Sequence, residues 1–582
     1  MKLSAGQTKV LLLISSVAFL RTMRDTISLN RMTKQICQTC TKEFVIRDED
    51  LVFYEQMKTI PPLFCPECRM ARRLLFRNER ILYKRPCDLC KKDMITLYAP
   101  ESPYKVYCHD CWWSDEWNPK DYGMDYNPNK KFFDQYEELQ SKVPRLGLAA
   151  FSNVRSDYTN GSAENKDCYL IFAADYNEDC LYGRLLQRDK QCVDCAFLHE
   201  SELCYECIDC RKCFKCMHSE QCQDSTDLLF CYNLKNSNNC IFCTNERNLS
   251  NAIYNIKYNK EEFENKKKEI LKDYESIEKA KKEFEEIKKK TIRKFATQTK
   301  CQNVTGDYIH NCQDGVELFD TYDAKNCSYM KDTEKPIDSM DCNNYYYNPQ
   351  FGYNIMGALE GSMLRNSAFV FYSNEVDYCD MCYHLSNGIG CISIRKGNYM
   401  ILNKEYSKEE YLSIKKQIEE QLKNDELFGQ FFPGEVAPFA YNESLIQDFF
   451  PLTKDEAIKR GYKWQERTTG TYNKETIKKG MVPSSVAEIN DEIINEILVC
   501  EECDKNFKIT EAELLFYRKM NLPLPHKDFE CRHRDRMKKR NGMKLYHRSC
   551  MKEGCQNEFE TTYSREQPET IYCESCYQSE IY

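Results

Sequence analysis

The stretch CPECRMARRLLFRNERILYKRPCDLC, residues 65–90, holds two Cys-x2-Cys pairs on either side of an arginine-rich run. A similar stretch, CRHRDRMKKRNGMKLYHRSCMKEGC, returns at residues 531–555. In both copies, 18 residues separate Cys68 from Cys87 and Cys531 from Cys550. A further 17 residues separate Cys90 from Cys108 and Cys555 from Cys573. Two matching gaps indicate that one module is duplicated near the two ends of the chain.

The composition favours a multidomain metal protein. A chain of 582 residues has room for roughly four domains, each with its own core. Its 35 cysteines are odd in number and often paired at x2 spacing, and so long a chain needs no disulfide staples. We therefore predict a reducing compartment, the cytoplasm. The net charge of −8 argues against a whole-protein binder of polyanions.

The N-terminal segment, residues 1–31, has two interpretations. A short apolar run from Val10 to Leu20 follows lysines and resembles the core of a signal peptide. The only small-x-small cleavage candidate, residues 16–18, lies inside that run. The favoured interpretation is an upstream extension, with translation starting at Met32. The run is too short to span a bilayer.

Cysteine pairs in the N-terminal module predict zinc sites. Zn²⁺ takes four ligands in a tetrahedron, and a Cys-x2-Cys turn supplies two of them. Sequential pairing gives two four-cysteine sites, whereas a cross-braced arrangement would join the first pair to the third. We predict the sequential arrangement. Its ligands are Cys37, Cys40, Cys65, Cys68, Cys87, Cys90, Cys108 and Cys111.

The C-terminal module departs from this pattern at one ligand. Asp528 stands where Cys65 would align, so the first site there lacks one cysteine. Asp528, His526 or His533 could complete it, since carboxylate and imidazole both bind zinc, or this site has lost its metal. The predicted ligands are Cys500, Cys503, Asp528, Cys531, Cys550, Cys555, Cys573 and Cys576.

Two longer stretches carry a resemblance to a known family. They are CQTCTKEFVIRDEDLVFYEQMKTIPPLFCPECR and CEECDKNFKITEAELLFYRKMNLPLPHKDFECR. Both resemble a treble-clef or zinc-ribbon-like family of bacterial proteins. The whole chain resembles large bacterial proteins in which zinc ribbons flank a cysteine-rich repeat region. The resemblance implies zinc binding at Cys37, Cys40, Cys65, Cys68, Cys500, Cys503 and Cys531, and it implies no reaction.

The basic runs beside the cysteines predict a binding surface. A zinc-anchored helix with an arginine face could follow phosphates, and Trp112, Trp113 and Trp117 could stack bases. Alternatives are a protein-binding surface, or arginines that pair with acids elsewhere while the tryptophans fill a seam. The candidate nucleic-acid contacts are Arg69, Arg72, Arg73, Arg77, Arg80, Arg532, Arg534, Arg536, Lys538, Lys539 and Arg540.

In the middle of the chain, cysteine recurs every nine residues from Cys195 to Cys240. We interpret nine residues as half of an 18-residue β-solenoid coil, with the cysteines in a buried ladder. The alternative is a zinc or iron–sulfur cluster at CYECIDCRKCFKCMH, residues 204–218. Two helices are predicted to follow the strand-rich arrays, with Asn259 and Ser407 as N-caps.

The predicted fold is multidomain α+β and mainly β, with tandem zinc ribbons at both ends and two β-solenoid-like arrays between them, each followed by a helix. No phosphate-binding glycine loop, nucleophile elbow or His-Glu-x2-His motif is present in the sequence. We therefore predict a non-enzymatic Zn²⁺ protein that binds nucleic acid or a protein partner, with no membrane and no small-molecule substrate. The predicted segments are 1–31, 32–125, 150–258, 259–298 (helix or helix pair), 299–406, 407–495 (helix and connector) and 496–582.

Overall fold

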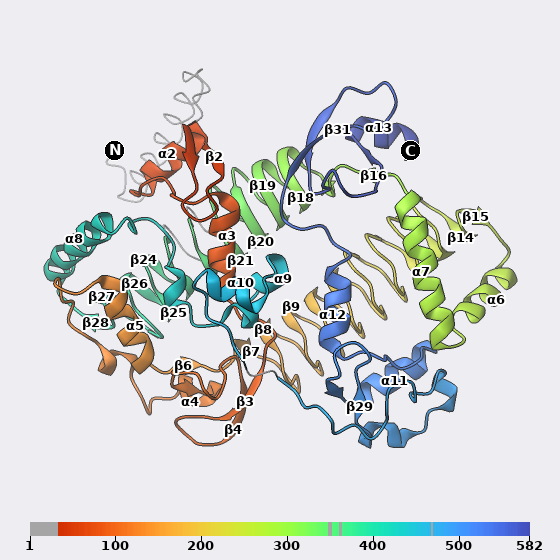
Figure 1. The fold of residues 1–582 in the computed structure, drawn as a ribbon, viewed down its shortest axis with the longest axis horizontal. Coiled ribbons are helices and arrows are strands. Elements are labelled where there is room, and N and C mark those ends of the chain that lie inside the picture. The colour runs from red at the N-terminus through yellow and green to blue at the C-terminus, as the bar shows by residue number, and fades with distance from the viewer. Residues whose placement is uncertain (1–32, 347–351, 360–363, 467–468, 582) are drawn as a thin grey trace, which may run out of the picture.

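The computed structural model describes residues 33–346, 352–359, 364–466 and 469–581 (Figure 1). The predicted segment 1–31 lies outside the described residues, so both of its interpretations stay predictions. The protein is a mixed α/β chain in which strands predominate. Within the described part, no helix is long and apolar enough to cross a membrane.

The two end modules share one order of elements: a hairpin, two helices, a second hairpin, a short strand and a helix. In the N-terminal module these are β1 (Thr33–Ile36), β2 (Glu43–Ile46), α2 (Asp48–Gln56), α3 (Pro66–Leu75), β3 (Tyr83–Pro86), β4 (Asp93–Thr96), β5 (Val106–Tyr107) and α4 (His109–Trp113). In the C-terminal module they are β29 (Leu498–Val499), β30 (Asn506–Phe507), α11 (Glu511–Met520), α12 (Phe529–Met537), β31 (Tyr546–Ser549), β32 (Glu558–Thr561), β33 (Ile571–Tyr572) and α13 (Glu574–Ile581).

The first array, residues 150–257, is a stack of parallel coils. Its bridges join Val154 to Lys166, Lys166 to Glu178 and Glu178 to Lys190, so each coil has 12 residues. The predicted 18-residue coil is therefore wrong. The strands are β7 (Ala150–Phe151), β8 (Asn160–Ala163), β9 (Phe172–Asp175), β10 (Arg184–Gln187), β11 (Ala196–His199), β12 (Thr226–Leu229), β13 (Asn238–Ile241), β14 (Ser250–Ile253) and the antiparallel β15 (Ile256–Lys257).

Each coil consists of four triplets. Every third residue from Ser152 to Tyr254 has a φ between 45° and 61°, in the left-handed region. In the triplet that begins at Tyr169, the first N–H donates to the carbonyl of Cys180 in the next coil at 3.0 Å. The N–H of the left-handed Leu170 donates to Asp157 in the coil before at 3.3 Å. These bonds between coils oppose the steric cost of left-handed residues, about 1–2 kcal/mol each.

The third residue of each triplet points inward, which explains the cysteine spacing. Nine residues are three triplets, so the cysteines from Cys195 to Cys240 all occupy inward positions and are buried. The thiols of Cys207 and Cys231 donate to the carbonyls of Cys216 and Cys240, nine residues further on, both at 3.3 Å. The prediction of a buried cysteine ladder is confirmed.

The second array, residues 298–405, repeats this construction, with 12-residue steps such as Ala368 to Asp380. Its strands are β17 (Gln298–Thr299), β18 (Gln302–His310), β19 (Gln313–Tyr322), β20 (Ser328–Glu334), β21 (Asn343–Tyr346), β22 (Met356–Leu359), β23 (Ala368–Phe371), β24 (Asn374–Asp377), β25 (Asp380–Tyr383), β26 (Leu385–Ile389), β27 (Gly397–Ile401) and β28 (Lys404–Glu405).

A helix or helix pair follows each array, as predicted. Asn259 caps α6 (Lys260–Ile270) and Ser407 caps α8 (Lys408–Asn424), each in a capping box with a glutamate. α7 (Tyr274–Lys290) completes the pair after the first array. The connecting elements are η1 (Pro119–Tyr122), α5 (Phe132–Lys142), β6 (Arg145–Leu146), β16 (Arg293–Lys294), η2 (Gly434–Val436), η3 (Tyr441–Glu443), α9 (Ile446–Phe449), α10 (Lys454–Lys459), η4 (Val486–Glu488) and η5 (Asp491–Asn495).

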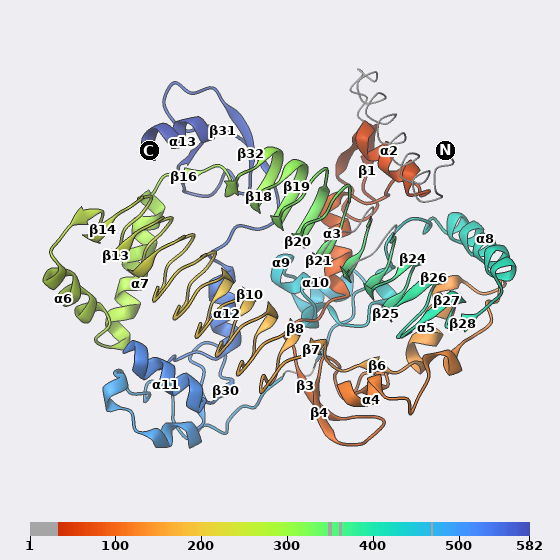
Figure 2. The same cartoon turned by 180° about the vertical axis from the view of Figure 1, so that it is seen from behind.

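Each end module contacts both arrays. β5 of the N-terminal module pairs with β6, just before the first array, and β33 of the C-terminal module pairs with β16, just before the second. The other half of each module packs on the opposite array. Leu514 and Tyr517 share a core with Leu181 of the first array, while Tyr54 shares one with Met340 of the second. Each module therefore lies against both arrays (Figures 1 and 2).

Candidate metal centres

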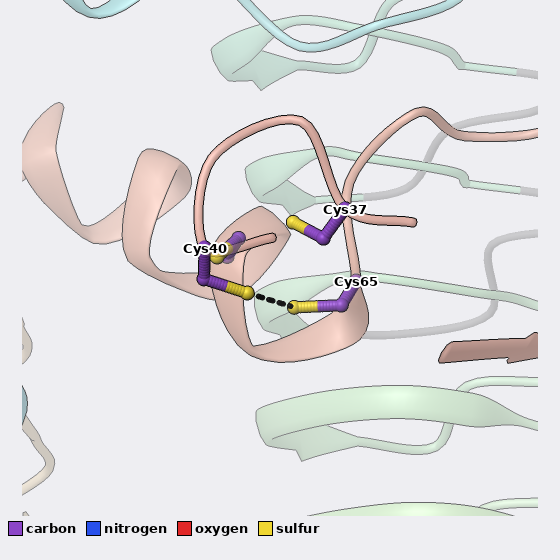
Figure 3. Close-up of side chains that lie close together, drawn as sticks. Cys37, Cys40 and Cys65 are labelled. Atoms are coloured by element: carbon purple, nitrogen blue, oxygen red, sulfur yellow. Dashed lines mark hydrogen bonds between the residues drawn. The ribbon is translucent and has the colours of Figure 1, made fainter. Parts of the chain in front are cut away.

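Four cysteines converge in the first half of the N-terminal module (Figure 3). The β1–β2 turn carries Cys37 and Cys40, while Cys65 is the N-cap of α3 and Cys68 lies in its first turn. Their sulfur atoms all lie within 4.8 Å of one another, and the Sγ atoms of Cys40 and Cys65 are 3.7 Å apart.

The same construction gives two further four-cysteine groups. One joins the β3–β4 turn to the start of α4, with 3.9 Å between the Sγ atoms of Cys90 and Cys108. The other joins the β31–β32 turn to the start of α13, with 3.9 Å between Cys555 and Cys573. The structure thus brings together sequential pairs, not cross-braced ones: Cys87, Cys90, Cys108 and Cys111, and Cys550, Cys555, Cys573 and Cys576.

The fourth group has a carboxylate in place of one thiol. Asp528 lies with Cys500, Cys503 and Cys531, and its Oδ2 accepts a hydrogen bond from the Cys503 thiol at 3.0 Å. Asp528 is also the N-cap of α12, the place that Cys65 has in α3. Burial opposes ionisation of Asp528, but hydrogen bonds from the three cysteines outweigh it and lower its pKa to about 2.

Neither histidine offered as an alternative ligand joins this fourth group. The His526 ring stacks on Tyr274 with 3.6 Å between ring centroids, and its Nδ1 lies 3.0 Å from the Glu501 carboxylate. The His533 ring contacts the Arg80 guanidinium. Of the three candidates, only Asp528 lies with the cysteines.

The distances allow a test of whether zinc fits. A Zn–S bond of about 2.3 Å gives a tetrahedron with edges of about 3.8 Å. One sulfur–sulfur distance in each four-cysteine group, 3.7, 3.9 and 3.9 Å, matches that edge. A mixed sulfur–oxygen edge is about 3.5 Å, longer than the 3.0 Å between Cys503 and Asp528. The three four-cysteine groups therefore fit a tetrahedral ion, and the Asp528 group fits it less closely.

Local hydrogen bonding favours the thiolate of one cysteine in each of two groups, Cys65 and Cys87. A hydrogen bond from Cys68 lowers the pKa of Cys65 to about 5, against the effect of burial. Burial raises the pKa of Cys87, but backbone N–H donors, including that of Cys108 at 3.3 Å, lower it to about 7 overall. Thiolate is the form that binds metal.

The arginine runs do not form the predicted exposed face. Arg69, Arg73, Arg77, Arg532 and Arg536 are buried, and Arg72 donates to the carbonyls of Phe431 and Phe432. Arg80 is largely covered and is paired with Asp448. Arg540 is largely covered and is paired with Asp209 and Asp320. Of the eleven predicted contacts, only Arg534 and Lys538 are exposed, and Lys539 is partly covered. The predicted exposed arginine face is therefore wrong for these buried, ion-paired residues, while nucleic-acid binding itself stays a prediction.

These arginines instead join each module to the opposite array. Arg69 and Arg73 of α3 contact Asp341 at 2.9 and 3.2 Å. The corresponding Arg532 and Arg536 of α12 contact Asp194 at 2.9 and 2.7 Å. We call each pair of arginines with its aspartate a clamp. Both aspartates occupy left-handed positions and are almost fully buried.

One further contact, between a tyrosine of the array and an acid of the module, repeats beside each clamp. Tyr329 donates to Asp50 at 2.8 Å, and Tyr182 donates to Glu513 at 2.8 Å. Sequence reasoning missed the acids of both clamps. Two sequence signals were available. Tyr182 precedes Asp194 by one coil of 12 residues, as Tyr329 precedes Asp341. The pattern Cys-Arg-x3-Arg also occurs twice, beginning at the candidate metal ligands Cys68 and Cys531.

Trp112 and Trp117 fill a seam, as the alternative interpretation expected, whereas Trp113 is exposed. Trp112 is fully buried and meets Tyr383 of the second array with 5.7 Å between ring centroids. Arg395 of that array donates to the carbonyl of Trp117.

The array cysteines do not form a metal group. In the described ranges, no group of three or more converging ligands includes an array cysteine or His218.

No protein-family model matches the chain, and no curated protein matches it in sequence.

Proposed function

We propose that the chain is a zinc-binding, non-enzymatic scaffold protein, in which ribbons of the zinc-ribbon type at both ends hold two β-solenoids in one rigid body. The observation that carries the proposal is the match between the sulfur–sulfur distances, 3.7–3.9 Å, and the edge of a zinc–thiolate tetrahedron. The sixteen residues of the four groups would hold the metal, with Asp528 as the only oxygen ligand.

Bound zinc would supply folding free energy to half-modules too small to form stable cores alone. Cys65 and Asp528 begin the helices that carry the clamps. A fixed helix start fixes the direction of the helix, so the arginines one and two turns later meet a buried aspartate. The metal groups thus support the docking of each module on an array.

A non-enzymatic role is supported by the ligand sets. Four protein ligands leave no open position at a metal for substrate or water. Free thiols at all 35 cysteines support the proposed cytoplasmic location. Because the arginines are internal, we propose a protein partner rather than nucleic acid.

Elemental mass spectrometry of the purified chain tests this proposal. We expect four zinc ions per chain in the wild type, and one fewer in Cys90→Ala. Asp528→Cys should retain four zinc ions per chain. A chelator should remove the ion of this group more slowly than in the wild type, because the variant has a fourth thiolate there. Cys204→Ala, in the buried ladder, is the matched control and should leave the count unchanged. Iron in place of zinc, or a metal count that Cys204→Ala lowers, would contradict the proposal.

A further inference from the structure

A cavity of about 190 Å³ lies where the first array, α7, the start of the second array and the C-terminal module meet. It has room for about six water molecules, at roughly 30 Å³ each. Its walls include Tyr232, Lys288, Arg293, Tyr308 and Glu569. None of these residues belongs to the four candidate metal groups or to the clamps.

Arg293 is the unusual residue of this cavity. It is 7% exposed, and its Nε and Nη1 have no hydrogen-bond partner. The guanidinium lies 3.7 Å from the centre of the Tyr232 ring, and Nη2 donates to the carbonyl of Lys288. The carboxylate whose charge acts on Arg293 is Glu220, and Glu220 is already paired with Lys288 at 2.8 Å. A buried charge with unused donors is costly, so a ligand that accepts these donors would be stabilised.

Arg145 is an instructive comparison, since it occupies the matching place before the first array. Arg145 lies in β6, which pairs in parallel with β5, as Arg293 lies in β16 beside β33. The Arg145 guanidinium is neutralised by Asp380 at 2.8 Å. Arg293 thus has the same position in the fold and lacks the acid.

The other charges of the cavity limit what can bind. Asp209 is paired with Arg540 at 2.9 Å, and Glu220 with Lys288 at 2.8 Å. Glu569 has one buried oxygen, Oε2, without a partner. A ligand must therefore offer hydrogen-bond acceptors to Arg293 and a hydrogen-bond donor to Glu569.

We propose that this cavity binds a protonated oxyanion, namely hydrogen phosphate or a small phosphate monoester. Its oxygens accept from Nε and Nη1 of Arg293, and its P–OH group donates to Glu569. Sulfate matches phosphate in shape but carries no proton near neutral pH, so it would meet the Glu569 carboxylate without a hydrogen bond. The site should therefore discriminate phosphate from sulfate.

Titration calorimetry of the full chain with inorganic phosphate, sulfate and glycerol phosphate tests the site. We expect phosphate to bind at least tenfold more tightly than sulfate. Arg293→Gln should lose binding of both ions, and Glu569→Gln should bring the two affinities together. The control Arg155→Gln changes an exposed arginine of the first array and should leave binding unaltered. Tighter binding of glycerol phosphate than of inorganic phosphate would identify the monoester as the ligand.

Equal binding of phosphate and sulfate by the wild type would overturn the proposal, as would phosphate binding that Arg293→Gln retains. If Arg293→Gln does not fold, phosphorus NMR of phosphate with the wild type decides the matter. Line broadening that an equal concentration of sulfate fails to reverse supports the site, and its absence contradicts it.

Discussion

At the scale of single residues, the clamps explain why arginine runs accompany the cysteine pairs. Arg532 and Arg536 share Asp194, and all three are buried. Removing one member of a buried ion pair costs about 3–5 kcal/mol, because the remaining charge stays desolvated.

Asp194→Asn should therefore lower the free energy of unfolding by about 3–5 kcal/mol. Urea denaturation followed by tryptophan fluorescence measures the change. Asp224→Asn is the matched control, since Asp224 also has a left-handed φ in the first array but is exposed. Similar small losses in the two variants would show that the clamp does not stabilise the fold.

The convergence of the candidate metal ligands could be predicted because their spacing is local, whereas the clamp acids could not be predicted. Cys65 and Cys68 are three residues apart, and a turn fixes their relation. Asp341 and Arg69 meet only because the second array folds back onto the N-terminal module. Exposure of the arginines was inferred from their helical spacing, and that inference failed because each helix buries its charged face.

At the scale of elements, the array is built on a three-residue unit that the sequence only partly reveals. The nine-residue recurrence correctly identified the inward positions. It gave the wrong coil length because nine residues are three of four triplets. The 12-residue period was present in Cys168, Cys180, Cys192, Cys204 and Cys216, but the nine-residue series concealed it.

The triplet makes opposite demands on neighbouring residues. Lys212 has a φ of 51° on the exposed surface, while Arg211 before it forms bridges to His199 and Gln223. Lys212→Gly removes a left-handed side chain, whereas Arg211→Gly only adds freedom to an extended residue. The free energy of unfolding of Lys212→Gly should exceed that of Arg211→Gly by about 1–2 kcal/mol, as measured by thermal unfolding. The reverse order would contradict the triplet.

At the scale of the whole molecule, buried charges also join the two arrays at the centre. Glu79 of the N-terminal module contacts Arg184 of the first array at 2.8 Å, and Arg184 lies 3.6 Å from Asp332 of the second. Burial alone would raise the pKa of Glu79, but Arg184 and Arg77 lower it to about 2.

A lowered pKa gives Glu79 a stabilising effect that is complete above its ordinary pKa of 4.5 and is lost as pH falls toward 2. The shift corresponds to about 3 kcal/mol near neutral pH. Urea unfolding of the wild type and Glu79→Gln should show that difference at pH 6. At pH 3 the difference should shrink to less than half, and a constant difference would contradict the ion-pair explanation.

The proposed function has modules pinned by metal that brace two arrays, whose described residues form no metal-ligand group. Hydrogen exchange of the full chain, with and without a zinc chelator, tests it most directly. We predict that metal removal lowers amide protection in the modules and also in the array coils around Asp194 and Asp341. Loss of protection confined to the modules, with both arrays unchanged, would contradict the claim.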